Sequence, residues 1–221
     1  MTVEEAIFLA KRDIVDLIYA SAEIEGIGVT YPDTRELYEG RSVAGLSVDD
    51  ILKINNLKHA WRFVLEDITR PVDLGYIREL HGELGSHEII NAGCLRHDEV
   101  YIGGTSWRPE MPDEIVAQKR IEEILGDVYT NDEPKPEVSR ECALDLFCYI
   151  CRAQLFYDGN KRLAQLAANK VLIAGGVGVL RVPDEAQKEF LQRLVLFYES
   201  GDATELKDLL RRTSIRSQEF R

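Results

Sequence analysis

Residues 154–162 read Gln-Leu-Phe-Tyr-Asp-Gly-Asn-Lys-Arg, and this stretch decides how the chain is interpreted. Upstream, from residue 138 to 153, apolar residues recur at three- and four-residue spacing, which predicts an amphipathic helix. Downstream, residues 163–174 are rich in Ala and Leu, and Gly175-Gly176 supplies a helix stop signal. Asp158-Gly159-Asn160 between them is a helix-breaking cluster. The pattern therefore predicts two helices joined by a tight turn.

The turn has the composition of an anion-binding site. A helix N-terminus presents free backbone N–H groups and the positive end of the helix dipole. Lys161 and Arg162 add two cations, and Asn160 can donate from its side chain. Gly159 allows a close approach to the backbone, and Asp158 is a hard ligand suited to Mg²⁺. An ordinary helical corner with solvated charges explains the turn equally well, so both interpretations stay open at this point.

Composition narrows the class of protein. The chain has 221 residues, of which 45% are hydrophobic and 30% charged, as in a soluble globular domain. Its net charge of −12 argues against nucleic acid as a partner. No apolar run approaches the roughly 20 residues of a membrane span, and the acidic N-terminus does not resemble a signal peptide. We therefore expect no membrane association and a cytoplasmic location.

Helical periodicity dominates the rest of the sequence. Helices are expected at residues 3–23, from Ser47 to about 68, from Asp73 to about 84, and at 112–128, 183–200 and 203–212. A charged loop is expected at 130–136. Only 94–107 look β-like, with Val100-Tyr101-Ile102 and a Gly103-Gly104 turn predicting a short hairpin. The fold class predicted is all-α, a compact helical bundle with one small β-hairpin.

Two smaller features are interpreted as structural. Cys148 and Cys151 have C-x-x-C spacing inside a predicted helix, without a second pair or a nearby His, so we expect buried apolar residues rather than a zinc site. The last eleven residues carry four Arg against one Glu. A frayed, solvated tail is the favoured interpretation, and a basic contact strip is the alternative.

The central turn resembles the motif of the Fic/Doc family, His-x-Phe-x-(Asp/Glu)-Gly-Asn-Gly-Arg-x-x-Arg. The matching residues are Phe156, Asp158, Gly159, Asn160 and Arg162. Lys161 replaces the second Gly, as in Doc-like members. The family's His, its frequent Pro and its second Arg are replaced by Gln154, Leu155 and Gln165.

Two further segments extend the resemblance. Residues 21–26, Ser-Ala-Glu-Ile-Glu-Gly, fit the family's inhibitory signature (Ser/Thr)-x-x-x-Glu-(Gly/Asn). Leu95-Arg96 and the segment from Val100 to Pro109 resemble the flap hairpin that precedes the catalytic helix. The resemblance implies a single Fic-type domain over 1–221. It would comprise an N-terminal helix with the inhibitory motif in 1–30, a core in 47–200, and a C-terminal helix and tail in 201–221.

The resemblance also implies ligands and partners. These are ATP or a related nucleotide, Mg²⁺, and a target protein that receives AMP on a hydroxyl; a homodimer stays open. Asp158 would coordinate Mg²⁺. The residues implied for nucleotide binding are Gly159, Asn160, Lys161, Arg162 and Gln165. The flap residues implied for strand addition to the target are Val100, Tyr101, Ile102, Gly103 and Gly104. The residues implied for inhibition are Ser21, Glu25 and Gly26.

Gln154 stands where the family keeps its general base. A glutamine amide can only hydrogen-bond near pH 7, and losing a general base costs roughly 10²- to 10⁴-fold in rate. We therefore predict nucleotide binding with absent or very slow AMP transfer. His97 near the flap is a minor candidate for a substitute base, whereas His81, flanked by Leu80 and Leu84, is expected to be packed.

Three alternatives stay open. The first is a non-catalytic binding module, and the second is a Doc-like phosphotransferase, which Lys161 suggests. The third is an enzyme that removes AMP, with Glu25 holding a water. Because Gln165 replaces the second motif Arg, Glu25 is expected to reach only Gln165 or Arg162.

Overall fold

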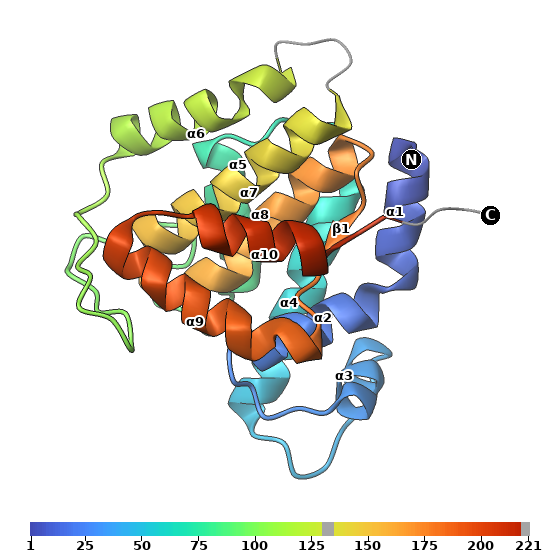
Figure 1. Ribbon diagram of the computed structural model, residues 1–221. Helices are drawn as coiled ribbons and strands as arrows, with labels where there is room; N and C mark the ends of the chain where they lie inside the picture. The colour runs from blue at the N-terminus through green and yellow to red at the C-terminus, as the bar shows by residue number, and fades with distance from the viewer. Residues whose placement is uncertain (130–134, 218–221) are drawn as a thin grey trace.

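The computed structural model describes residues 1–129 and 135–217 and confirms the helical fold class (Figure 1). A two-stranded antiparallel sheet pairs Val179 with Arg216 and Leu180 with Ile215. The elements are α1 Val3–Arg12, α2 Ile14–Ile24, α3 Tyr31–Tyr38, α4 Val48–Glu66, α5 Leu74–Leu84, α6 Glu114–Tyr129, α7 Pro136–Ala153, α8 Asn160–Ala174, β1 Val179–Leu180, α9 Asp184–Ser200, α10 Thr204–Thr213 and β2 Ile215–Arg216.

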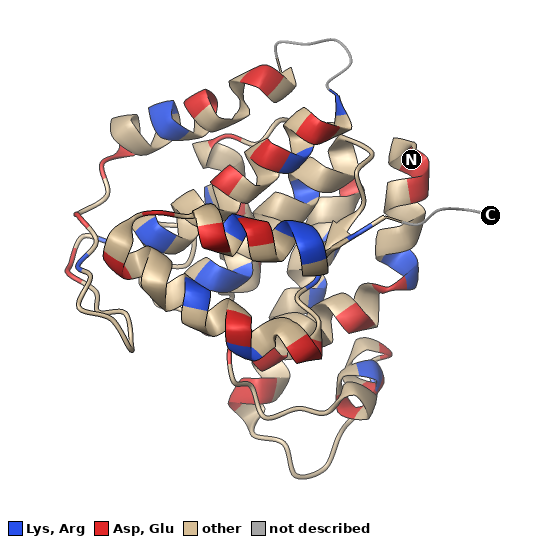
Figure 2. Ribbon diagram, viewed as in Figure 1, with Lys and Arg blue, Asp and Glu red and all other residues tan. Residues whose placement is uncertain are grey.

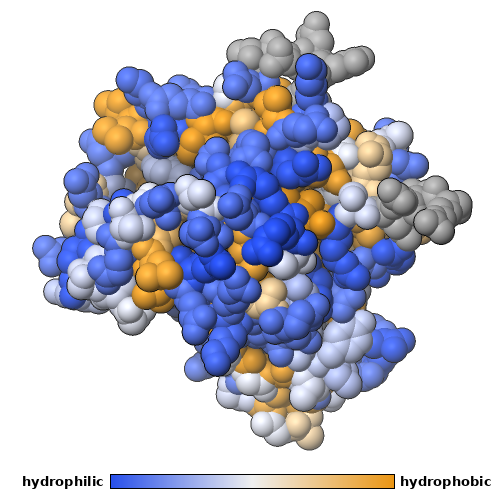
Figure 3. All heavy atoms as spheres, viewed as in Figure 1, coloured by the Kyte–Doolittle hydropathy of each residue, from blue (hydrophilic) through white to orange (hydrophobic). Residues whose placement is uncertain are grey.

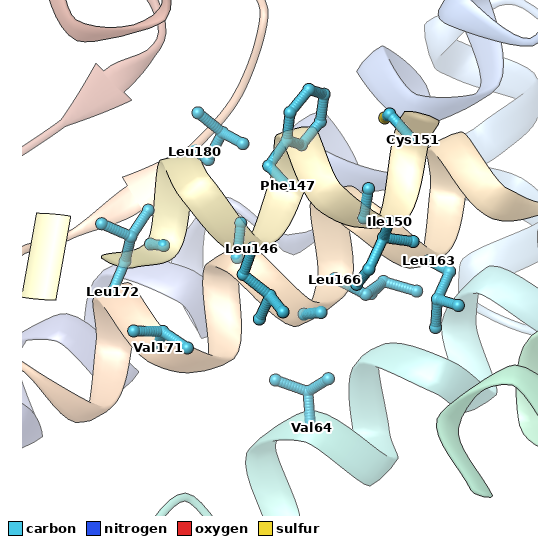
Figure 4. Packing of buried hydrophobic residues seen from close by; sticks show 14 of the residues in the cluster. Val64, Leu146, Phe147, Ile150, Cys151, Leu163, Leu166, Val171, Leu172 and Leu180 are labelled. Atoms are coloured by element: carbon cyan, nitrogen blue, oxygen red, sulfur yellow. The ribbon is translucent and has the colours of Figure 1, made fainter. Parts of the chain in front are cut away.

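The central element is α8, which α1, α4, α5 and α7 surround. Thirteen of its fifteen residues are buried, Asn160 and Arg162 among them. Figure 4 shows Leu146 and Ile150 of α7 beside Leu166 of α8, with Val64 of α4 on the other side. Burying large apolar side chains on several faces fixes α8 in place. The N-terminus of α8, where the central turn ends, is therefore held by the core.

Local signals placed most helix ends correctly. The Ser47 hydroxyl accepts from the Asp50 N–H (3.0 Å), and Asp73 accepts from the Tyr76 N–H (2.7 Å), so both residues are N-caps. Helix α7 begins two residues before the predicted start at residue 138, because Pro136, expected in the loop, occupies its first turn, where the missing N–H costs nothing. Cys148 and Cys151 are buried free thiols, as expected. Residues 130–134 of the expected charged loop lie outside the described residues.

The single helix predicted for 3–23 is wrong, because the chain breaks at Asp13 into α1 and α2. Asp13 leaves the helical region (φ −97°, ψ 16°) while its N–H still donates to the Leu9 carbonyl. Its carboxylate accepts from the Arg12 guanidinium at 2.7 Å. The break lets α1 pack on α8 and β1 while α2 packs on α3, α4 and α9.

The hairpin predicted for 94–107 is also wrong, since the structure assigns no strand there. Side chains hydrogen-bond the backbone of this loop instead of a second strand. The Arg96 guanidinium donates to the Asp98 carbonyl (2.8 Å), and the Glu199 carboxylate accepts from the Ser106 N–H (2.5 Å). The strands that do form are β1 and β2, which the sequence pattern missed. We keep the name flap for residues 96–110.

The frayed tail expected for the last eleven residues is wrong for residues 211–216, which lie in α10, its C-cap and β2. Arg211 lies in α10 and donates twice to Glu141 of α7 at 2.7 Å, and Arg216 lies in β2. Residues 218–221 lie outside the described residues. Figure 2 shows acidic and basic residues interspersed along α6, α7 and α10. Within the described ranges, no helix combines the length and apolarity needed to cross a bilayer.

Candidate functional site

The central turn is closed by its own side chains. Gln154 ends α7 in the left-handed region (φ 46°), and Gly159 precedes α8 with φ 72°. Asn160 donates from Nδ2 to the Phe156 carbonyl (2.8 Å) and accepts on Oδ1 from the Phe156 N–H (3.1 Å). The Asn160 side chain, which the sequence suggested as an anion donor, is thus committed to the turn.

The backbone of the turn still offers donors. Among the described residues, no acceptor is recorded for the N–H groups of Asn160, Lys161 or Arg162, and no side chain caps α8. The one nearby carboxylate that accepts a backbone proton is Asp158, which bonds the Gly159 N–H at 2.6 Å. Unpaired N–H groups at a helix start form an anion-binding site, and burial makes leaving them unpaired costly. The turn can therefore hold an anion through its backbone.

Gln154 carries the polar side chain at the start of the turn. Its Nε2 donates to the Cys151 carbonyl (2.6 Å), and its Oε1 accepts from Asn160 Nδ2 (3.1 Å). Both ends of the amide are therefore engaged, and neither can take up a proton at neutral pH. The Gln154 carbonyl accepts from Arg96 Nε at 2.6 Å, which joins the turn to the flap.

Arg162 is buried and already paired. Its guanidinium makes two hydrogen bonds to Glu88, at 2.8 and 3.1 Å, and only 2% of its side chain is exposed. Burial opposes the charge, but the bonds to Glu88 outweigh it, and the pKa of Arg162 rises above its ordinary value. Glu88 lies in the loop after α5, and sequence reasoning missed it because no motif marks it.

At the end of α2, Glu25 supplies a second carboxylate that contacts the turn. Glu25 Oε2 lies 3.6 Å from Lys161 Nζ, and the Ser21 hydroxyl donates to Gln165 Oε1 at 2.9 Å. Glu25 pairs with Lys161 while Ser21 takes Gln165, so no direct contact of Glu25 with Gln165 or Arg162 is recorded among the described residues. The charge of Glu25 nevertheless helps to raise the pKa of Arg162. Gly26 follows with φ 69° and turns the chain away. Residues far apart in sequence, the 21–26 motif and the turn, are thus in contact.

His81 packs against the turn and hydrogen-bonds its backbone. Its ring stacks on Phe156 with 3.8 Å between centroids, and its Nδ1 accepts from the Gly93 N–H at 2.9 Å. Because Nδ1 accepts, the proton of the neutral ring lies on Nε2, which donates to the Asp158 carbonyl at 3.0 Å. His81 is fully buried, as expected for a packed residue, but the sequence did not reveal that it holds the turn.

Protonation of His81 should cost stability. Burial is the main cause that lowers its pKa from 6.5 to about 4. As pH falls, the unfolded chain takes the proton first, so the contribution of His81 is complete above pH 6.5 and is lost between pH 6.5 and 4. The full loss is about 3 kcal/mol. The free energy of unfolding, measured with urea across this window, should change less with pH in His81→Gln than in His59→Gln. His59→Gln is the control because it makes the same change at an exposed position. An equal dependence on pH in the two variants would refute the assignment.

Asp158 is exposed at the turn and could coordinate a cation, but it is not part of a cluster of metal-binding side chains among the described residues. Its side chain is 69% exposed, and its Oδ2 lies 4.0 Å from Arg162. The described residues contain no group of three or more His, Cys, Asp or Glu side chains that could bind a metal. Mg²⁺ bound together with phosphates commonly uses one or two carboxylates, so Asp158 fits that use.

The flap lies beside the turn with exposed residues on it. Arg96 is buried and donates to the carbonyls of Gln154, Asp98 and Glu110, while Tyr101 is largely exposed. His97 lies within 3.2 Å of the Tyr157 hydroxyl. His97 is thus held in a flap cluster, and no contact between it and Gln154 is recorded among the described residues.

Comparison with known proteins agrees with this geometry. The model of the Fic/DOC family matches residues 71–172, which run from the start of α5 through the turn and almost all of α8. The chain belongs to the Fic/Doc family.

Relatives of this Fic/Doc chain are distant. Protein adenylyltransferase Fic of Drosophila willistoni is 29% identical over 189 residues, which are 84% of this chain and 37% of that protein. The chain thus spans just over a third of the length of such relatives. Fic-1 of C. elegans superposes with a TM-score of 0.76 at 20% identity, covering 93% of this chain and 62% of the other. The BepC protein of Bartonella tribocorum, solved with bound AMPPNP, gives 0.52 at 16%, covering 83% and 89%. At these identities the structures show the shared fold.

Proposed function

We propose that this Fic/Doc chain binds ATP or a related nucleotide, with Mg²⁺, at the start of α8, and that it transfers AMP to a protein hydroxyl only very slowly. The observation that carries the proposal is the set of three backbone N–H groups at residues 160–162 for which the described part of the chain records no acceptor. The names of relatives, protein adenylyltransferase Fic, and the AMPPNP in the BepC structure support a nucleotide as the anion.

The roles of the residues follow from their chemistry. The N–H groups would bind phosphate oxygens, and Lys161 would add a charge once it leaves Glu25. Asp158 would hold Mg²⁺, which neutralises phosphate charge when bound. In AMP transfer, a hydroxyl oxygen bonds to the α-phosphorus, pyrophosphate leaves, and the hydroxyl proton needs an acceptor. Gln154 is not an acceptor for that proton, so the rate is expected to be low.

Calorimetric titration of Mg·ATP tests the site directly. We expect saturable binding to the wild-type chain and a Kd about tenfold weaker for Lys161→Ala, since a charge-assisted contact to phosphate is lost. Lys119→Ala on α6 is the control and should bind as wild type does, because Lys119 also pairs with a glutamate but is more exposed and lies outside the turn. Absence of binding to the wild-type chain would refute the proposal.

Glu25 is proposed to restrain the site by occupying Lys161. Replacing it with the isosteric Gln should tighten the Kd for Mg·ATP about two- to fivefold, the scale of a partly exposed ion pair. Glu23→Gln is the matched control, because Glu23 lies on the same helix but bonds Tyr19 (2.5 Å) and Gln187 (2.6 Å) instead. Identical affinities for the two variants would show that Glu25 does not obstruct nucleotide.

A binding module without catalysis is the second candidate. It is favoured by one observation, that both cations of the turn are already paired with the chain's own carboxylates, Glu25 and Glu88. The flap would then present a protein-binding surface, and nucleotide would stabilise the fold. Labelled ATP separates the candidates: label from the α-phosphate on protein means AMP transfer, label from the γ-phosphate means phosphotransfer, and binding without label means a module.

A further inference from the structure

A cavity lies at the end of α7, next to the flap. It has a volume of about 580 Å³, which is within the range of small-molecule sites. It is bounded by the start of α6, the last turns of α7, the junction of α9 and α10, and the end of the flap. Leu155 of the turn lines it, whereas none of residues 156–165 does. On the left of Figure 3 the surface is hollowed below the hydrophobic atoms of α6. This cavity, the Trp107 pocket, is therefore separate from the proposed nucleotide site.

The walls of the Trp107 pocket are mainly apolar. They include Trp107, Met111, Val116, Tyr149, Leu155 and Phe197. The Arg152 guanidinium covers a face of the Trp107 ring, and Met111, Val116 and Tyr149 supply apolar surface against which a flat or branched group can pack. Apolar walls of this kind favour a ligand with a hydrophobic body, because water leaves the surfaces of both.

One cation lies in this apolar setting without an anion. The Arg152 guanidinium lies 3.5 Å from the centroid of the Trp107 ring and 6.0 Å from that of Phe197. Its recorded side-chain hydrogen bond runs from Nε to the Tyr198 carbonyl at 3.4 Å. Within the described part of the chain, no carboxylate forms an ion pair with Arg152. Burial lowers the pKa of Arg152, which means that an anion near it would be favoured.

The acidic residues that line the pocket form no recorded ion pair with Arg152. Asp145 pairs with Lys207 at 2.7 Å, and Asp113 accepts from the Val116 N–H at 2.9 Å, at the start of α6. Glu110 is exposed at the rim. Arg120, the other cation of the lining, already pairs with Glu123 at 3.1 Å. Arg152 is thus the charged group of the lining with its anion-binding capacity unused.

We propose that the Trp107 pocket binds a small organic monoanion with an aromatic or branched apolar body. The anionic group accepts from the two Nη groups of Arg152, a geometry that suits a planar carboxylate. The apolar body packs against the other apolar walls of the pocket, which Met111, Val116 and Tyr149 supply. The site requires neither nucleotide nor AMP transfer, so it stands independently of the proposed function.

Two fluorescent probes of similar shape but different charge test the proposal. They are 8-anilinonaphthalene-1-sulfonate, an anion, and N-phenyl-1-naphthylamine, which is neutral. We expect saturable binding of the anion to the wild-type chain, weakened about tenfold or more by Arg152→Gln, while binding of the neutral probe changes less than twofold. Arg108→Gln is the matched control, because Arg108 stacks on Tyr101 of the flap and does not line the pocket.

A second variant locates the probe. Val116 lines the pocket and is 65% exposed, so Val116→Trp should fold normally and exclude both probes. Far-ultraviolet circular dichroism confirms folding of each variant. The proposal is overturned if the anion binds Arg152→Gln as tightly as wild type, if both probes weaken equally in that variant, if Val116→Trp leaves binding intact, or if the anion does not bind saturably.

Discussion

Replacing Glu88 with Ala is expected to lower the free energy of unfolding by about 3–5 kcal/mol. The change removes the only two hydrogen bonds recorded for the Arg162 guanidinium among the described residues. Arg162 Nε is buried and already lacks a partner in that part of the chain, Asp158 is 4.0 Å away, and Glu25 acts on Arg162 only through its charge. The variant therefore leaves a buried positive charge without a hydrogen-bonded carboxylate, which is far more costly than losing an exposed pair.

The chain contains a matched control for this prediction. Glu79 makes the same two-bond contact to Arg70, with both distances 2.7 Å, but the two side chains are 52% and 36% exposed. Glu79→Ala should cost less than about 1 kcal/mol. Urea unfolding of both variants gives the comparison, and Glu88→Ala combined with Arg162→Met should recover much of the loss. Equal losses for Glu79→Ala and Glu88→Ala would contradict the burial argument.

Gln154→His is expected to raise the rate of AMP transfer by roughly 10²- to 10⁴-fold. An imidazole at this position can take the proton of the attacking hydroxyl, which an amide cannot. Gln154 has φ 46° and ψ 60°, a left-handed conformation that His tolerates better than most residues, so the backbone need not change. Asn160 retains its two bonds to Phe156, which keep the turn closed.

The measurement is transfer of label from α-phosphate-labelled ATP to protein. Gln154→Ala is the control, because it removes the amide without supplying a base and should stay as slow as wild type. Calorimetry on the same variants establishes that nucleotide is bound in each. If Gln154→His binds ATP but labels no faster than Gln154→Ala, the slow rate has another origin, and the missing second Arg at Gln165 becomes its explanation.

Local sequence signals were enough for most of the fold. Ser47 and Asp73 set helix starts through bonds within three residues, so the sequence reveals them without tertiary information. Asp13 is only mildly unfavourable inside a helix, and the break there depends on how α1 and α2 pack. No spacing rule could have located it.

The flap and the partners of the turn depend on distant residues. The β-like pattern at 100–102 predicted strands, but Arg96 and Glu199 satisfy polar groups of the flap that a hairpin would have paired. Glu88 lies 74 residues from Arg162, and His81 lies 77 residues from Asp158. Contacts of this separation are set by the packing of α5 against α8, and a single sequence carries no local sign of them.

The hydrogen bonds of Arg96 have a consequence for how the flap would bind other molecules. One buried side chain holds the carbonyls of Asp98 and Glu110 at both ends of the flap and that of Gln154 in the turn. The loop is thus ordered before any segment arrives, and docking would sacrifice little additional chain entropy. The recognition proposed for the flap would then resemble the fit of two preformed shapes, and it would select partners by shape.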